Sequence, residues 1–166
     1  NKVNFPILIQ GLGCTETGAR IVLRELLGAA PSGRPYWVLC TTETAKDFIG
    51  RPWGRFSKDV YVVGLSHRLF GRWLRPLVEL AIGLMVVTRL VKAVVNLSHY
   101  GLCFGGPYTL YVHSPLLMDV STDTGWGEGR PNRLKRWMLN SCIRRAQLVV
   151  LQTQGMRLQL MAYCEY

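Results

Sequence analysis

Acidic residues are scarce in this chain of 166 residues: 10 Asp and Glu stand against 20 Lys and Arg, a formal net charge of +10. Such an excess of positive charge favours an anionic partner, for example a nucleotide, a phospholipid surface, a nucleic acid or a phosphorylated glycan. Charge alone does not choose among them. Hydrophobic residues make up 49% of the chain, enough for one folded domain with a substantial core.

Paired cysteine motifs are missing as well. The five cysteines are scattered, odd in number and form no Cys-x-x-Cys pair: Cys14, Cys40, Cys103, Cys142 and Cys164. This pattern argues against a disulfide framework and against a zinc site. It favours reduced thiols in the core of a cytosolic protein.

Several signatures of enzymes, targeting and nucleic-acid binding are also absent. The sequence has no Walker loop, no Gly-x-Ser-x-Gly elbow, no His-Glu-x-x-His and no kinase signature. It has no helix-turn-helix or RNA-binding aromatic pattern, so no nucleic-acid partner is expected. No signal peptide is recognisable at the start. The longest apolar stretch, 77–95, is broken by Glu79, Arg89 and Lys92, which indicates a buried or membrane-apposed helix rather than a transmembrane span.

What is present is an alternation of strand and helix patterns. Apolar runs at 5–10, 36–41, 59–65, 93–97, 109–113 and 147–151 predict strands. Helical periodicity predicts helices near 19–27, 67–92 with a bend at Pro76, 132–145 and 155–163, and a short helix and loop between 41 and 59. This order predicts an α/β fold with a doubly wound, mostly parallel, Rossmann-like sheet of about six or seven strands.

Polar and small residues collect where the strands end, which predicts a cleft at that edge of the sheet. The first of these places is the loop that contains Gly11, Gly13 and Gly18. Its spacing does not match the dinucleotide fingerprint, but a strand–glycine turn–helix can still bring backbone N–H groups against a phosphate. The alternative is a turn that needs glycine for its backbone angles.

His113 ends the fifth strand, immediately before Ser114 and Pro115. A neutral imidazole there is suited to accepting a proton from a sugar hydroxyl or to binding a phosphate, or it serves to hold the following loop. His99 is the weaker candidate and fits the wall of the cleft. Asp119, Asp123 and Glu128 lie in the long loop 114–130, but their spacing matches no calcium loop and favours solvated carboxylates over a metal site.

A basic segment with aromatic and apolar neighbours runs from His67 to Arg75. Arg68, Arg72, Trp73 and Arg75 are suited to an anionic bilayer surface. The alternative is an ordinary amphipathic helix packed on the sheet. The arginines of the helix at 132–145 allow the same two interpretations.

Taken in order, these parts resemble the N-terminal half of a GT-B-fold glycosyltransferase of the large retaining family that makes lipopolysaccharides and other polysaccharides. Four places carry the resemblance: residues 7–20 (ILIQGLGCTETGAR), 94–98 (VVNLS), 111–115 (YVHSP) and 139–154 (LNSCIRRAQLVVLQTQ). The family's paired glycine appears here as Gly-Leu-Gly, and Gln147 stands where an Asp is common.

The resemblance implies roles for individual residues. His113 is expected to face the transferred sugar as the catalytic residue. Gly11, Gly13 and Thr15 are expected to approach the donor phosphates. Glu16, His99 and Ser114 are expected at the acceptor. No metal or other cofactor is required in the family, because positive groups and helix N-termini stabilise the leaving diphosphate.

The resemblance also implies the domain organisation and the partners. Residues 1–166 correspond to the acceptor-side domain, and a nucleotide-sugar-binding domain is expected but absent from this chain, which is expected to be inactive alone. The complete enzyme would transfer a sugar from a nucleotide-sugar to a glycan or lipid-linked acceptor. It would lie in the cytoplasm, at the inner face of the cytoplasmic membrane. Two alternatives remain: a non-catalytic α/β module that binds an anionic glycan or membrane surface, and a nucleotide-sugar epimerase.

Overall fold

The computed structural model describes residues 5–14, 17–98, 106–112 and 130–164. The strands are β1 (Ile7–Gly11), β2 (Tyr36–Thr41), β3 (Trp53–Arg55), β4 (Val60–Leu65), β5 (Ala93–Asn96), β6 (Tyr108–Val112) and β7 (Leu148–Leu151). The helices are α1 (Thr17–Gly28), α2 (Thr42–Ile49), the π-helical segment η1 (His67–Trp73), α3 (Arg75–Val87), α4 (Arg130–Arg145) and α5 (Gln154–Cys164).

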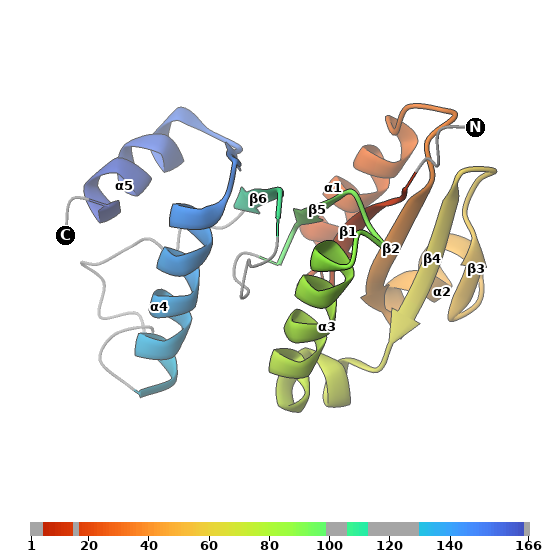
Figure 1. Ribbon diagram of the computed structural model, residues 1–166, viewed down its shortest axis with the longest axis horizontal. Helices are drawn as coiled ribbons and strands as arrows, with labels where there is room; N and C mark the ends of the chain where they lie inside the picture. Colours follow the sequence, from red (N-terminus) through yellow and green to blue (C-terminus); the bar gives the residue numbers. More distant parts are fainter. Residues whose placement is uncertain (1–4, 15–16, 99–105, 113–129, 165–166) are drawn as a thin grey trace.

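The seven strands form one sheet in the order β3-β4-β2-β1-β5-β6-β7 (Figure 1). Neighbouring strands pair in parallel throughout, except that β3 runs antiparallel to β4. The fold class predicted from the sequence is therefore confirmed: the chain is an α/β protein with a doubly wound, mostly parallel, Rossmann-like sheet.

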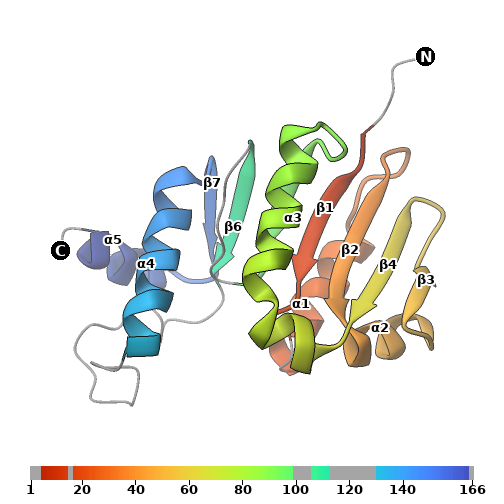
Figure 2. The ribbon, with the colours of Figure 1, turned by 60° about the horizontal axis from the view of Figure 1, so that its bottom comes forward.

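The helices are divided between the two faces of this sheet (Figure 2). The chain moves outward from β1 to β2 and β4 through α1 and α2, and α3 then returns it to β5 on the other side of β1. Because β-α-β crossovers are right-handed, α1 and α2 cover one face, and α3 and α4 cover the other. Two apolar clusters follow. The first contains Leu23, Leu27, Ala45, Val38 and Val62, and the second contains Val78, Ile82, Leu139, Leu8 and Leu110.

The edge strand β3 lies where the sequence predicts a loop, because Pro52 and Gly54 are typical of turns. The strand exists through long-range pairing, in which Trp53, Gly54 and Arg55 lie opposite Val63, Val62 and Tyr61 of β4. A three-residue strand at the sheet edge carries too little local pattern to be recognised from the sequence.

The predicted helical region 67–92 is divided in the structure. The π-helical segment η1 ends at Trp73, and α3 begins at Arg75 with Pro76 in its first turn, where the missing N–H of proline costs least. The helix ends at Val87, earlier than expected, and Arg89 adopts a left-handed backbone with φ 61°. Among the helices of the described residues, none combines the length and the apolar character needed to cross a bilayer.

We predict that Gly64→Ala lowers the free energy of unfolding by about 1–3 kcal/mol, because β4 passes too close to its neighbours for a side chain at this position. A Cβ atom on Gly64 would lie 2.7 Å from the carbonyl oxygen of Pro52, 2.9 Å from Ala45 Cβ and 2.9 Å from Thr42 Cα. Two of these are backbone atoms that cannot move alone. Chemical denaturation measures the change.

The control is Gly18→Ala in α1, where a Cβ atom meets nothing within 4 Å. Alanine at this helical position should leave the stability unchanged or raise it by up to about 1 kcal/mol. Equal stability of the two variants would contradict the close approach at Gly64.

Candidate functional site

The chain reverses direction across the sheet at β1. From β1 the chain continues to β2 on one side, and β5 lies on the other side, so the strand order reverses between β1 and β5. In open α/β sheets the crevice at such a switch point is the usual place for a ligand. The residues at this edge are Gln10 and Gly11 at the end of β1, Gly13 in the turn after it, Asn96 at the end of β5 and Ser98 beyond it.

The glycine turn after β1 is bonded across this switch point. The backbone N–H of Gly13 donates to Ser98 Oγ at 3.0 Å, and Cys14 N–H closes the turn by donating to the carbonyl of Gly11 at 3.0 Å. A Cβ atom on Gly13 would lie 3.0 Å from Ser98 Cα. A side chain at Gly13 would therefore press on Ser98, and glycine permits this close backbone approach. Its N–H is occupied by Ser98, so the contact with a donor phosphate expected for Gly13 requires this bond to open.

A carboxylate is buried beside the turn. Glu79 of α3 is fully buried, and its Oε1 accepts from Gln10 Nε2 at 2.6 Å and from Arg75 Nε at 2.7 Å. Gln10 is also fully buried, and Arg75 is 8% exposed. A buried carboxylate requires such partners, because an unpaired charge in the core is strongly unfavourable. The three residues tie the start of α3 to the carboxyl end of β1.

The prediction that Arg75 contacts a membrane surface is therefore wrong. The sequence groups Arg75 with Arg68 in one basic segment that is suited to a bilayer surface. The structure starts a new helix at Arg75 and turns its guanidinium inward onto Glu79. A pairing signal was present in the sequence, since Arg75 and Glu79 are four residues apart on a helix.

Two buried polar atoms at the switch point have no hydrogen-bond partner among the described residues: Gln10 Oε1 and Asn96 Nδ2. Gln10 and Asn96 are opposite one another in the β1–β5 register, so their side chains leave the same face of the sheet. The Asn96 side chain is held by its Oδ1, which accepts from Ser98 N–H at 2.8 Å. Unpaired buried polar groups are rare and costly, so this pair of one acceptor and one donor fits a polar ligand.

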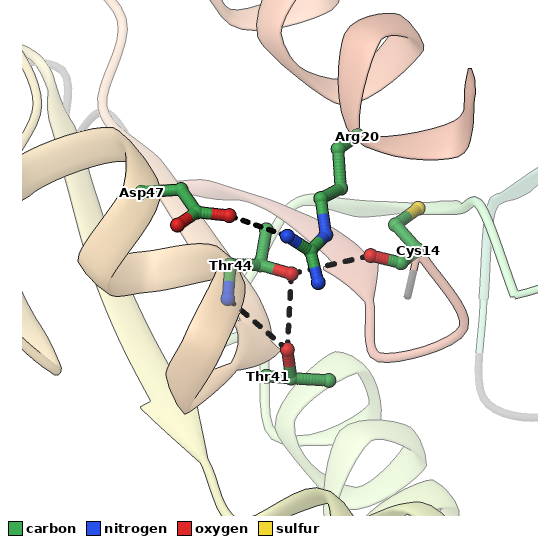
Figure 3. A network of polar contacts seen from close by, with 5 residues as sticks. All are labelled: Cys14, Arg20, Thr41, Thr44 and Asp47. Carbon is green, nitrogen blue, oxygen red and sulfur yellow. Dashed lines mark hydrogen bonds and ion pairs between the residues drawn. The ribbon is translucent and has the colours of Figure 1, made fainter. Parts of the chain in front are cut away.

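The N-terminus of α2 joins the site from the other side (Figure 3). Thr41 caps the helix by accepting from Thr44 N–H at 3.2 Å, and Thr44 Oγ1 donates to the carbonyl of Cys14 at 3.2 Å. Arg20 of α1 pairs with Asp47 of α2 at 2.5 Å. These contacts fix the end of the glycine turn against both helices.

The cysteines near this site are buried and free. Burial raises the pKa of Cys14 to about 12, and the nearby positive charge of Arg75 offsets a small part of that effect. Burial, together with the neighbouring Cys14, raises the pKa of Cys40 to about 12 as well. Both thiols stay protonated at neutral pH and are unsuited to nucleophilic catalysis. Cys14, Cys40 and Cys142 are free and buried, which confirms their predicted place in the core.

The sequence-predicted site residues are only partly brought together. Gly11 and Gly13 lie at the switch point, and Arg68 is exposed on η1, on the chain before α3. The backbones of Arg72 and Trp73 belong to η1, but their side chains lie outside the described part of the chain. The remaining predicted residues also lie outside the described residues: Thr15, Glu16, His99, His113 and Ser114, together with the loop carboxylates Asp119, Asp123 and Glu128.

Sequence reasoning missed the roles of Asn96 and Glu79. Asn96 is the last residue of a four-residue strand, and nothing in its local pattern distinguishes it from an ordinary strand end. Glu79 interrupts an apolar run, and such an isolated acid in a core helix is the signal that predicts a buried pair.

Comparison with known proteins gives no relative: the chain matches no model of a known protein family and no curated protein.

We predict that Glu79→Leu lowers the free energy of unfolding by about 3–5 kcal/mol, because it leaves the guanidinium of Arg75 buried without its carboxylate. The double variant Arg75→Met/Glu79→Leu should recover at least half of this loss, since no charge then remains. Urea denaturation measures both. Asp47→Asn, which breaks the exposed pair with Arg20, is the control and should cost less than about 1 kcal/mol. A double variant as unstable as the single one would show that the pair itself does not carry the effect.

We also predict that Cys14 and Cys40 resist alkylation in the folded protein. At pH 8 the thiolate is the reactive form, and a pKa of about 12 together with burial leaves very little of it. In urea both should react rapidly, and peptide mass mapping identifies the labelled sites. The folded state retains these two protons where the unfolded chain loses them, so stability should fall as the pH rises from about 9 to about 12. Rapid labelling of Cys14 in the native state would contradict its burial.

Proposed function

We propose that this chain is the acceptor-side domain of a GT-B-fold glycosyltransferase, which transfers a sugar from a nucleotide-sugar to a glycan or lipid-linked acceptor. One observation carries the proposal: Gln10 Oε1, an acceptor, and Asn96 Nδ2, a donor, are buried at the switch point and have no hydrogen-bond partner in the part of the chain that the structure describes. A sugar hydroxyl both donates and accepts hydrogen bonds, so a polyhydroxylated ligand satisfies both atoms. A purely anionic ligand would satisfy only Asn96.

The charge of the chain and the place of the crevice support the same function. The net charge of +10 favours a substrate that carries a diphosphate. The glycine turn, α1 and the capped start of α2 meet at the edge of the sheet where such ligands bind. In the proposed reaction His113 faces the transferred sugar, and Gly11, Gly13 and Thr15 approach the donor phosphates. Glu16, His99 and Ser114 line the acceptor side.

The proposed enzyme works with a second, nucleotide-sugar-binding domain and requires no metal. The acceptor hydroxyl attacks the anomeric carbon of the donor sugar as the bond to the diphosphate breaks. Positive groups and helix N-termini stabilise the charge that develops on the leaving diphosphate. We place this activity in the cytoplasm, at the inner face of the cytoplasmic membrane, where a lipid-linked acceptor is accessible.

A non-catalytic module that binds an anionic glycan is the second candidate. The bond from Gly13 N–H to Ser98 Oγ favours it, because it occupies a donor that the transferase would direct at the phosphate. A module that recognises glycan hydroxyls through Gln10 and Asn96 has no need of that donor.

We predict that His113→Ala in the full-length protein lowers the turnover of sugar transfer by about 100-fold or more, which is the usual contribution of a positioned acid–base group. Its free energy of unfolding should change by less than about 1 kcal/mol. Transfer is measured with a broad panel of labelled nucleotide-sugars and membrane-derived acceptors. His67→Ala, an exposed histidine on η1, is the matched control and should keep the wild-type rate.

The outcomes separate the candidate functions. Full activity of His113→Ala would remove this residue from the catalytic site. Neither transfer nor donor hydrolysis across the panel would favour the binding module. Conversion of the nucleotide-sugar without any acceptor would favour an epimerase.

A further inference from the structure

The helix α3 is apolar on two sides. Its inner side packs Val78, Ile82 and Val86 against the sheet. Its outer side exposes a row that we call the leucine face: Leu77, Leu80, Leu84 and Val87. These residues are spaced by three or four, so they lie along one side of the helix. A helix that is apolar nearly all round is normally covered on both sides, so the leucine face requires a partner.

An apolar groove lies beside this helix. The groove has a volume of about 500 Å³ and runs between α3 and the strands β2 and β4. Its walls include Trp37, Leu39, Tyr61, Val63, Ala81 and Met85. No helix of the described residues covers β2 and β4 on this face of the sheet, although α1 and α2 cover the other (Figure 2). Parallel sheets are normally covered on both faces, so the groove and the leucine face together form one uncovered apolar surface.

Positive charge borders this surface at both ends of α3. Arg68 is exposed before the helix, and Arg89 and Lys92 are exposed after it. The sequence from 60 to 98 contains a single acidic residue, Glu79, which is buried against Arg75. Among the described residues, the surface around α3 therefore carries cations and no exposed carboxylate.

The exposed acids lie elsewhere. Glu25 belongs to α1, and Glu43 and Asp47 belong to α2, on the opposite face of the sheet. The remaining described acid besides Glu79 is Asp59, in the turn before β4. The sequence from 129 to 164, which forms α4, β7 and α5, contains no Asp or Glu. The charge of the described residues is thus divided between the two faces, because their exposed carboxylates lie away from the side of α3 and α4, where the one acid, Glu79, is buried.

We propose that the leucine face of α3 and the groove beside it dock onto an anionic lipid bilayer, with α3 lying in the plane of the membrane. Leucine side chains would enter the acyl region, while Arg68, Arg89 and Lys92 reach the headgroups. Trp37 and Tyr61 at the groove have the amphipathic rings that favour the membrane interface. The distribution of charge favours an anionic bilayer as the partner, because such a bilayer complements both the apolar leucine face and the cations at its two ends. This docking surface does not rest on the proposed transfer reaction.

The test compares two matched substitutions in the full chain. Leu84 on the leucine face is 52% exposed, and Ile21 on α1, at the opposite face, is 56% exposed. Leu84→Glu and Ile21→Glu introduce the same charge at equally exposed helical positions, so they should affect folding alike. Binding is measured by flotation with vesicles of phosphatidylcholine, with and without phosphatidylglycerol.

The wild-type chain should float with the vesicles that contain phosphatidylglycerol, and more weakly at high salt. Leu84→Glu should lower the partition coefficient about tenfold or more, because a charge replaces an apolar group that inserts. Ile21→Glu should stay within about twofold of the wild type, because it faces away from the bilayer. If Leu84→Glu does not fold, Leu84→Ser replaces it, with Ile21→Ser as its control.

Three results would overturn the proposal. The first is a wild-type chain that does not float with anionic vesicles. The second is equal binding by the two glutamate variants. The third is concentration-dependent self-association without vesicles that Leu84→Glu abolishes, which would assign the surface to a second copy of the chain.

Discussion

The buried carboxylate of Glu79 connects the two halves of the sheet. It accepts from Gln10 at the end of β1 and from Arg75 at the start of α3, and so holds the returning helix to the strand where the chain changes direction. This contact fixes the rotation of α3 about its axis. Any rotation that buried the leucine face would withdraw Glu79 from both partners and leave a charge in the core. The exposure of four apolar side chains is thus a consequence of one buried polar contact.

The sequence could predict the elements whose pattern is local. Leu23 and Leu27 repeat at helical spacing, and 36–41 and 59–65 are apolar runs of strand length, so α1, β2 and β4 were all predicted. Contacts between distant segments were not predictable in this way. β3 exists because Gly64 has no side chain and lets Pro52 approach β4 closely, a constraint that no window around Trp53 reveals. The inward turn of Arg75 follows from the burial of its partner Glu79, which also accepts from Gln10, 69 positions earlier in the chain, and the basic segment alone does not reveal that contact.

The same distinction between local pattern and long-range contact applies to the candidate site. A glycine turn at the end of β1 and polar residues at the strand ends could be predicted, because a parallel sheet brings these ends to one edge. The hydrogen-bonding state of each polar group could not be predicted from the sequence. The bond from Gly13 N–H to Ser98 depends on β1 and β5 being neighbours in register, and the same register sets Asn96, whose amide nitrogen has no partner among the described residues, opposite Gln10. The order of strands, rather than any motif, decides which of these groups are available to a ligand.

The candidate polar site and the proposed docking surface share the same helix. α3 begins at Arg75, beside the glycine turn, and its leucine face starts two residues later at Leu77. Since η1 leads into this end of α3 and exposes Arg68, a bilayer that receives the leucine face also meets the basic segment next to the polar site. Docking through α3 would therefore set the carboxyl edge of the sheet close to the headgroups. An acceptor whose glycan is attached to a membrane lipid would reach Gln10 and Asn96 without leaving the bilayer, which joins the polar site and the apolar face in a single arrangement.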